Sequence, residues 1–294
     1  MASPVDEVEV VHRELVVRAT DGWALAADLL APADVAPRAA VVLAPALAVP
    51  RAYYRALAIH LAAGGLAVLS IDYRGVGESR PSRLRGFPAA LHDWADLDLT
   101  AALAHVRGAY PGLPVAWFGH SMGGQLFGLL REPAVDRVLL VGAQHGHWRH
   151  WPGPSRYLMA ALWHVVIPGM VAVAGRLPMG AVGRGEDVPP EVAREWARWG
   201  RDRDYVVGFA HRRGGACAFD TYAGPLRAYA ISDDRYAPAT TVRPLIEAFR
   251  ATRGELIEVA PASVGARALG HFGVFSRDRA LPLWDAWRAW LGGA

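Results

Sequence analysis

Residues 115–130 read VAWFGHSMGGQLFGLL, and this segment indicates the architecture of the whole chain. An apolar run leads into GHSMG (residues 119–123), and apolar residues then recur at the spacing of a helix. Glycines on both sides of Ser121 permit a sharp turn between strand and helix, because they carry no side chain that would clash. A turn of this form leaves a serine hydroxyl exposed above the end of a sheet. We therefore expect Ser121 to be a nucleophile rather than part of a plain tight turn.

The remaining sequence supplies further strands for such a sheet. Residues 9–31 hold two alternating stretches joined by Thr20-Asp21-Gly22, which predicts an antiparallel hairpin. From residue 38 onwards, short apolar runs alternate with amphipathic stretches, as is typical of a parallel sheet covered by helices on both faces. The sequence thus predicts an α/β fold with a mostly parallel sheet. The runs are AAVVLAPA (39–46), LAVLSIDY (66–73), PVAWFGH (114–120), VDRVLLVGA (135–143), LRAYAIS (226–232) and LIEVA (256–260).

Residues 145–224 interrupt this alternation and are rich in Trp, Gly and Pro. We predict that they form an inserted helical cap, and that residues 1–144 and 225–294 form the core. Within the cap, residues 157–175 are apolar for about 19 residues, which is near the lower bound for crossing a bilayer. His164 and Pro168-Gly169 interrupt this run, so we expect two short buried helices of a lid. Contact with a membrane surface and a true span are the less favoured alternatives.

The composition excludes several classes of chemistry. All 31 basic residues are Arg and no Lys occurs, which rules out Schiff-base chemistry and a Walker phosphate-binding lysine. Cys217 is the sole cysteine, so no intrachain disulfide or multi-cysteine zinc site can form. The net charge is only +3 and the arginines are spread along the chain, so we expect no nucleic-acid partner. The first residues lack the pattern of a signal peptide, and we expect a cytoplasmic location.

A serine nucleophile needs a base to remove its proton and an acid to orient that base. His271 lies in ALGHFG (268–273), flanked by glycines after an apolar run, and we assign it as the general base. The run at 226–232 ends in SDDRYAP (232–238), which places two carboxylates where a strand gives way to a loop. Asp234 is the preferred acid, and Asp233 is the alternative.

Other residues complete the candidate site. The Met122 backbone N–H and one from the loop after residue 44 are expected to bind a developing oxyanion; Pro45 has no N–H, so Ala46 or Leu47 supplies the second. Trp148 and Trp163 are candidate substrate contacts on an apolar lid. The spacing of the histidines in QHGHWRHW (144–151) permits a metal site, but no acidic residue is near, and we expect no metal and no cofactor. The G-x-G within residues 75–77 is interpreted as a structural turn.

The chain resembles the α/β-hydrolase fold family over residues 38–143 and 225–292, and within it a group of predicted bacterial hydrolases. The residues that carry the resemblance are DYRGVGES (72–79), GHSMGGQ (119–125), SDDRYAP (232–238) and GHFGVF (270–275). The resemblance implies Ser121 as nucleophile, His271 as base and Asp234 as acid. One departure concerns the early oxyanion loop, where many members carry His-Gly and this chain has Ala44-Pro45-Ala46.

Three functions are compatible with these residues. The favoured one is a serine hydrolase that cleaves an ester or related acyl bond of a small hydrophobic molecule. An acyltransferase or cyclising thioesterase would use the same acyl-enzyme and differ only in the acceptor. A ligand-binding protein with a dormant site is the third, because a fold does not determine a function. We expect a small-molecule substrate and no membrane partner, and the oligomeric state is not encoded in any recognisable pattern.

Overall fold

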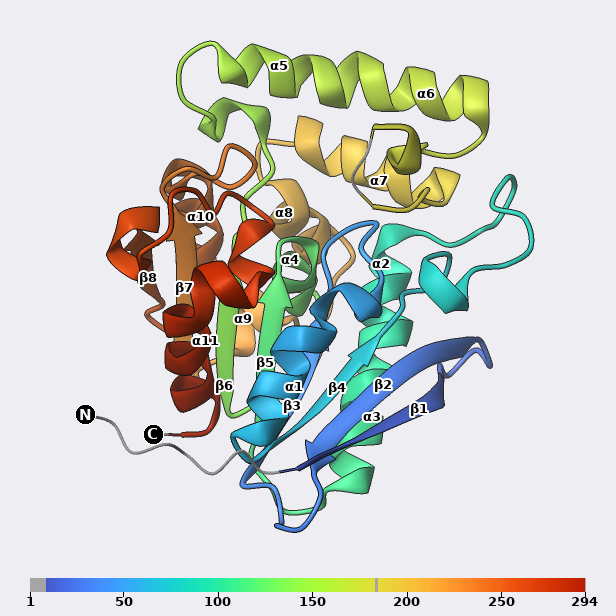
Figure 1. The fold of residues 1–294 in the computed structure, drawn as a ribbon. Helices are drawn as coiled ribbons and strands as arrows, with labels where there is room; N and C mark the ends of the chain where they lie inside the picture. The colour runs from blue at the N-terminus through green and yellow to red at the C-terminus, as the bar shows by residue number, and fades with distance from the viewer. Residues whose placement is uncertain (1–8, 183–184, 294) are drawn as a thin grey trace.

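A computed structural model describes residues 9–182 and 185–293 and has an eight-stranded sheet with helices on both faces (Figure 1). The strand order is β1-β2-β4-β3-β5-β6-β7-β8. The first two strands form the expected antiparallel hairpin, and β2 also pairs antiparallel with β4; all other pairs are parallel. The predicted α/β fold is therefore confirmed. The strands are β1 Val10–Arg18, β2 Ala24–Pro32, β3 Ala39–Ala44, β4 Leu66–Ile71, β5 Val115–His120, β6 Arg137–Val141, β7 Leu226–Ile231 and β8 Glu255–Val259.

The central strands are buried on both faces, as their continuous apolar runs require. Two apolar cores result. Helices α1 (Arg55–Ala63) and α11 (Arg277–Leu291) pack with one face of the sheet. Helices α3 (Thr100–Ala109), α4 (Met122–Phe127) and α10 (Ala239–Glu247) contribute to the core on the other face. The short helix α2 (Leu91–Asp93) leads into the segment that ends with α3.

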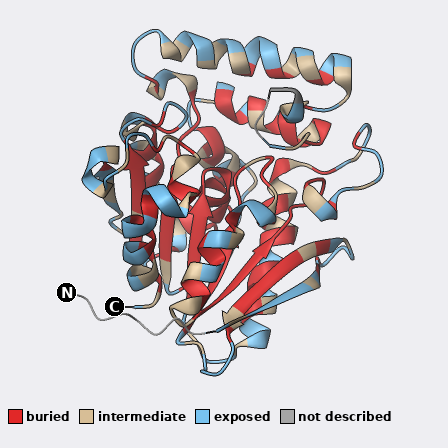
Figure 2. Ribbon diagram, viewed as in Figure 1, coloured by how far each residue is buried: buried red, intermediate tan, exposed pale blue. Residues whose placement is uncertain are grey.

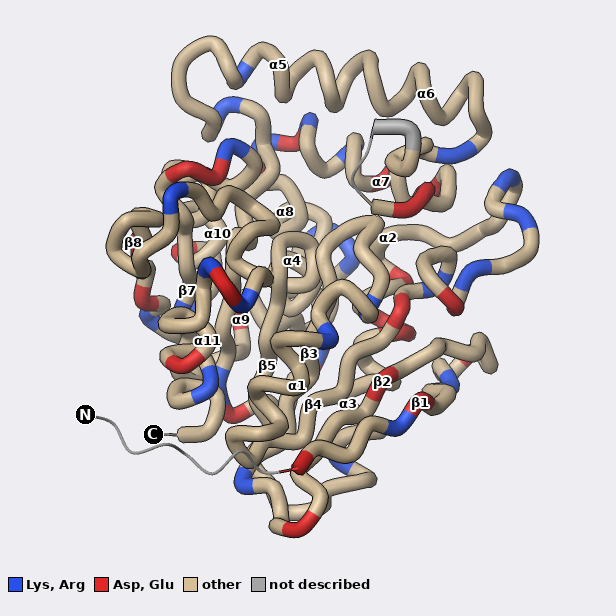
Figure 3. The backbone as a smooth tube through the Cα atoms, viewed as in Figure 1, with Lys and Arg blue, Asp and Glu red and all other residues tan. Residues whose placement is uncertain are grey.

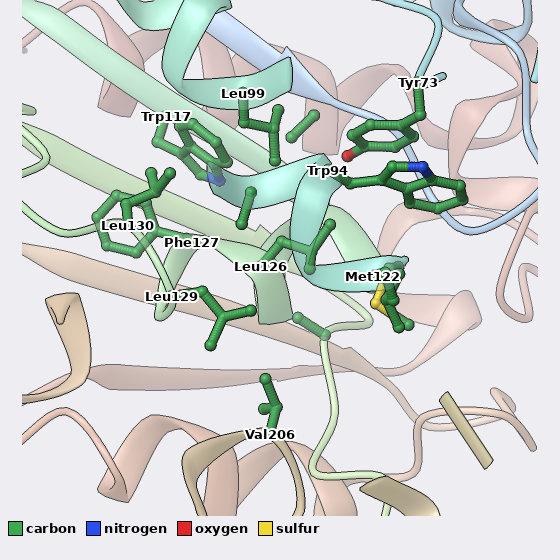
Figure 4. Packing of buried hydrophobic residues seen from close by; sticks show 14 of the residues in the cluster. Tyr73, Trp94, Leu99, Trp117, Met122, Leu126, Phe127, Leu129, Leu130 and Val206 are labelled. Atoms are coloured by element: carbon green, nitrogen blue, oxygen red, sulfur yellow. The ribbon is translucent and has the colours of Figure 1, made fainter. Parts of the chain in front are cut away.

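Helix α4, which follows Ser121, is buried along its whole length. Figure 4 shows Leu126 and Phe127 of this helix beside Trp117 of β5, and the two aromatic rings of Trp117 and Phe127 have centroids 5.2 Å apart. Tyr73 stacks on Trp94 in the same core, with the planes 4° apart. This dense packing leaves α4 little freedom to move, so the turn that carries Ser121 is held rigidly.

The residues between β6 and β7 form helices outside the sheet (Figure 1). Helix α5 (Ser155–Ala161) continues into α6 (Ile167–Ala174), and together they make one helical rod over α7 (Pro190–Arg201). Helices α8 (Tyr205–Arg212) and α9 (Ala218–Thr221) lead back to the core. A division of the chain at residues 145 and 224 remains a prediction.

The expectation of two short buried helices within residues 157–175 is wrong. Residues Ser155–Ala174 form one continuous helical segment. In its most apolar stretch of 18 residues, only 17% of the residues are buried. Pro168 does not break the helix, because the preceding turn, Leu162–Val166, has the wider i→i+5 hydrogen-bond pattern. A wider turn of this kind accommodates the missing proline N–H without ending the helix.

Candidate active site

Ser121 occupies the tight turn that joins β5 to α4. Its φ is +51°, a left-handed conformation that a non-glycine residue rarely adopts. A Cβ on Gly123 would lie 2.1 Å from the Ala44 carbonyl oxygen, so the chain passes too close to β3 for any side chain there. The Ser121 backbone N–H donates to the Val141 carbonyl at 2.9 Å. The turn is therefore as tight as the sequence predicts, and its backbone strain lies at Ser121 itself.

The side chains of His271 and Asp234 are in hydrogen-bonding contact. The His271 Nδ1 atom lies 2.6 Å from Asp234 Oδ2, and both side chains are buried. The other carboxylate oxygen of Asp234 accepts from the backbone N–H groups of Tyr236 and Ala237, at 2.7 and 3.1 Å. An acceptor at Nδ1 places the ring proton there, which leaves Nε2 with the lone pair that a general base needs.

Asp233 has different partners from its neighbour. Its carboxylate accepts from the backbone N–H groups of Leu269 and Gly270, at 3.0 and 2.8 Å. These two residues immediately precede His271 in the loop after β8. Asp233 thus fixes the path of the loop, while Asp234 contacts the ring. Of the two aspartates that the sequence left open, Asp234 is the one beside the histidine.

Ser121 and His271 both lie next to the end of β6. Val141 accepts the Ser121 N–H, and a Cβ built on the next residue, Gly142, would lie 3.1 Å from the His271 ring. Within the described residues no hydrogen bond joins the Ser121 hydroxyl to this ring. Catalytic hydrogen bonds are often long in a protein without its ligand and shorten when the reacting complex forms.

A buried network that the sequence analysis missed supports the histidine loop. The Ala46 N–H donates to the Tyr54 hydroxyl at 2.9 Å, and this hydroxyl lies 2.7 Å from His120 Nδ1. His120 Nε2 lies 3.1 Å from the His271 carbonyl oxygen. Burial lowers the pKa of His120 well below the usual histidine value, so the ring is neutral and donates one hydrogen bond while accepting another. Tyr54 carried no sequence signal, because its role depends on three segments far apart in the chain.

This network distinguishes the two candidates for the second oxyanion donor. The Ala46 N–H is occupied by Tyr54, whereas the N–H groups of Leu47 and Met122 have no hydrogen bond within the described part of the chain. Met122 is the first residue of α4, where backbone N–H groups point out of the helix. Of the three backbone N–H groups that the sequence suggests as oxyanion donors, those of Leu47 and Met122 are therefore unoccupied.

A cavity of about 1020 Å³ lies beside His271. Its apolar side chains include Val49, Pro50, Tyr53, Phe272 and Phe275, from the loop after β3 and from the histidine loop. Its charged side chains are Glu186, Asp233 and Arg279, and Ser121 does not line it. Neither predicted substrate contact lines this cavity. Trp163 is fully buried and packs edge-on against Trp196, with ring centroids 4.7 Å apart. Trp148 lines a second cavity of about 1010 Å³, next to α10.

Histidines are numerous in that second cavity, which includes His145, His147 and His150. Burial lowers the pKa of His145 to about 3, so this ring is neutral at physiological pH. Among the described residues, the groups whose ligand atoms lie close enough together to hold a metal ion are elsewhere. They are His211 with Cys217 and Asp220, and His12 with Glu14 and Asp28. Neither group contains Ser121, His271 or Asp234.

Comparison with known proteins places this site in a wider context. The family model described as "Serine aminopeptidase, S33" matches residues 35–189, which include the Ser121 turn. A comparison with curated proteins gave no significant match. Solved structures with a similar fold include the esterase domain of a Rhodothermus marinus protein, 20% identical with a TM-score of 0.59, which covers 96% of this chain and 99% of that one.

Two further esterases have comparable similarity. A thermostable carboxyl esterase from Bacillus coagulans is 14% identical, with a TM-score of 0.60 and coverage of 96% of this chain and 98% of that one. An esterase from Pyrococcus furiosus is 17% identical, with a TM-score of 0.61 and coverage of 99% and 92%. At this level of identity the likeness concerns the fold alone.

Proposed function

Because the chain belongs to the serine aminopeptidase S33 family of α/β hydrolases, we propose that it cleaves an ester or related acyl bond with Ser121, His271 and Asp234. The observation that carries the proposal is the 2.6 Å contact between His271 and Asp234, at the strand end where Ser121 occupies a strained turn. Family membership supports a hydrolase, and this geometry supports the individual roles. An acyl bond is favoured because the unoccupied N–H groups of Met122, the residue after the serine, and of Leu47 suit a tetrahedral oxyanion.

The proposed reaction has two halves. His271 Nε2 takes the Ser121 proton as Oγ attacks the carbonyl carbon, and the Leu47 and Met122 N–H groups bind the oxygen that becomes negative. The intermediate collapses, His271 returns the proton to the leaving alcohol, and an acyl-enzyme remains. Water, deprotonated by His271, then attacks the acyl carbon. As the second tetrahedral intermediate collapses, His271 returns this proton to Ser121 Oγ and a carboxylic acid is released. Asp234 stabilises the imidazolium form of the ring in both halves.

The substrate is proposed to be a small hydrophobic molecule. Val49, Pro50, Phe272 and Phe275 give the cavity beside His271 apolar walls, which suit an uncharged acyl or alcohol group. Residues 145–224 are proposed to act as the cap over this site. Glu186, from this segment, lines the same cavity. We propose that the acyl group passes to water, which makes the reaction a hydrolysis. Transfer to an alcohol, amine or thiol is the alternative that this proposal does not favour.

Intact mass after treatment with a fluorophosphonate tests the proposal without any assumption about substrate. The expected result is one adduct on the unaltered protein and none on Ser121→Ala or His271→Ala. Turnover of a p-nitrophenyl ester is expected to fall by roughly 10³-fold or more in the same variants. Ser263→Ala is the matched control, because this serine is exposed and does not line the cavity, so this variant should keep both the adduct and the turnover. Full turnover by a folded Ser121→Ala would contradict the proposal.

A further inference from the structure

The outward face of the helical rod Ser155–Ala174 is apolar and uncovered (Figure 2). Tyr157, Leu158, Val165 and Val173 are 68%, 73%, 67% and 84% exposed. Several of the residues between them on this face are small and apolar, Ala161, Gly169 and Ala172 among them, and they are exposed too. A continuous exposed apolar stripe is unfavourable in water and marks a surface that contacts something else.

The opposite face of the rod holds it against the protein. Trp163, Ile167 and Val171 are fully buried, and Trp163 packs edge-on against Trp196 of α7. The rod is therefore fixed parallel to α7 at the outer edge of the molecule, as Figure 1 shows. It could cross a bilayer only by breaking these contacts. A helix with one face held by protein and one apolar face outward suits an in-plane position at a membrane surface.

The charges around the rod indicate what kind of surface its exposed face contacts. No Asp, Glu, Lys or Arg occurs from residue 157 to 175, and no acidic residue occurs between Asp136 and Glu186. Arg149 precedes the rod and lies over the Trp148 ring, and Arg156 lies in its first turn and donates to the Gly153 carbonyl. Within the described residues neither is paired with a carboxylate. Arg85 donates to the Ala174 carbonyl at the other end, where Arg176 pairs with Asp187. Figure 3 shows basic residues in blue near the two ends of this rod and no charged residue along its middle.

We propose that this rod binds the surface of a bilayer that contains anionic phospholipids. The exposed apolar stripe would enter the boundary between headgroups and acyl chains, and the unpaired arginines would contact lipid phosphates. A second copy of the chain is a poorer occupant. Two rods packed face to face would bring arginine-flanked ends together with no acidic residue of the rod to pair with them. This proposal concerns binding alone and is independent of the proposed function.

Vesicle flotation tests the proposal. One set of vesicles contains phosphatidylcholine alone, and the other an equal mixture of phosphatidylcholine and phosphatidylglycerol. The expected result is binding to the mixed vesicles that weakens as sodium chloride is added, because salt screens the attraction between arginine and phosphate. Replacing Leu158, Val165 and Val173 together by Glu should lower the partition coefficient by about tenfold or more. Arg149→Gln with Arg156→Gln should reduce the preference for the anionic vesicles.

The control variant carries Val35→Glu and Ile59→Glu, two exposed apolar residues outside the rod, and should bind as the unaltered protein does. Circular dichroism verifies that each variant is folded. Three results would overturn the proposal: no binding to either vesicle, equal binding to both vesicles, or equal loss of binding in the control variant. A concentration-dependent dimer in light scattering, abolished by the rod variant and accompanied by no vesicle binding, would assign the surface to a second copy instead.

Discussion

Asp233 and Asp234 are adjacent in the sequence, yet their carboxylates face different partners. Asp234 accepts from the His271 ring, and Asp233 accepts from two backbone N–H groups that shape the loop before that ring. A difference of one residue thus separates a carboxylate that contacts the His271 ring from one that holds the loop before it. The sequence could not separate them firmly, because both sit in the same loop with the same chemistry.

Replacing each aspartate by Asn should reveal this difference. Asp234→Asn is expected to lower kcat for a p-nitrophenyl ester by roughly 10⁴-fold, because an amide cannot stabilise the imidazolium ring in the same way. Asp233→Asn keeps one acceptor oxygen for two N–H donors, so it should cost about 1 kcal/mol of stability and less than about tenfold in kcat. A larger loss of kcat in Asp233→Asn than in Asp234→Asn would reverse the assignment.

Gly77 shows why the G-x-G in residues 75–77 is a structural turn. Its φ is +54°, and a Cβ there would lie 2.2 Å from Asp72 Oδ2. That carboxylate accepts from the backbone N–H groups of Arg51 and Glu78, at 2.7 and 2.9 Å. The glycine therefore makes room for a buried carboxylate of the protein itself.

The Gly77→Ala variant should lose about 3 kcal/mol or more in urea unfolding, since the new methyl group displaces the Asp72 carboxylate. Gly86→Ala is the matched control: Gly86 also has a positive φ, +79°, but open space where a Cβ would lie. Its cost should be about 1 kcal/mol, from backbone strain alone. Equal losses in the two variants would show that the contact with Asp72 contributes nothing.

At the scale of elements, helix α7 is tied to α2 through one histidine. Glu195 on α7 is buried, and its carboxylate accepts from the His92 backbone N–H at 3.0 Å and contacts His92 Nδ1 at 3.0 Å. The hydrogen bond to Glu195 raises the pKa of His92 above the ordinary histidine value. This pair connects the segment between β6 and β7 to the core, and its strength depends on the charge of the ring.

The sign of the pH effect follows from the raised pKa. The stabilisation from protonated His92 is complete below the pKa of the unfolded chain, and it disappears as the pH rises through the higher folded pKa. His92→Gln can still donate to Glu195 but does not titrate. Thermal unfolding at about pH 5.5 should find the unaltered protein more stable than His92→Gln, and at about pH 8.5 the difference should shrink. A difference that grows with pH would contradict the raised pKa.

At the scale of the whole molecule, one residue joins two loops that lie far from it in the chain. Glu186, from the segment between β6 and β7, donates its N–H to the Ala48 carbonyl at 2.7 Å and accepts the Gly77 N–H at 2.7 Å. It thereby joins the loop after β3 to the loop after β4. Ser121 itself is only 8% exposed. We therefore expect reagents to reach this serine after local opening of the loops around it.

Removing the side-chain link should increase access. Glu186→Ala is expected to raise the second-order rate of fluorophosphonate labelling by roughly two- to tenfold, because the loops separate more easily. Glu186→Gln retains an acceptor for the Gly77 N–H and should label at nearly the unaltered rate. An unchanged rate in Glu186→Ala would show that this contact does not limit access to Ser121.

The sequence by itself determined the α/β class, the order of the strands along the chain and the turn around Ser121. These features depend on local patterns: apolar runs of strand length, glycines that permit a tight turn, and a histidine between glycines. Local patterns do not predict the structure of residues 157–175. His164 and Pro168 are expected to interrupt the helix, but a wider helical turn accommodates the proline, and the rod is continuous and exposed.

Only the tertiary structure decided which groups meet. It placed Asp234 rather than Asp233 on the ring, engaged the Ala46 N–H with Tyr54, and put Trp163 in the packing between the rod and α7. Each of these outcomes depends on how residues 8 to 37 positions apart in the chain are brought together in space. Local sequence patterns specify the conformation of a segment, but hydrogen bonds and packing between distant segments exist only once the sheet has brought them together.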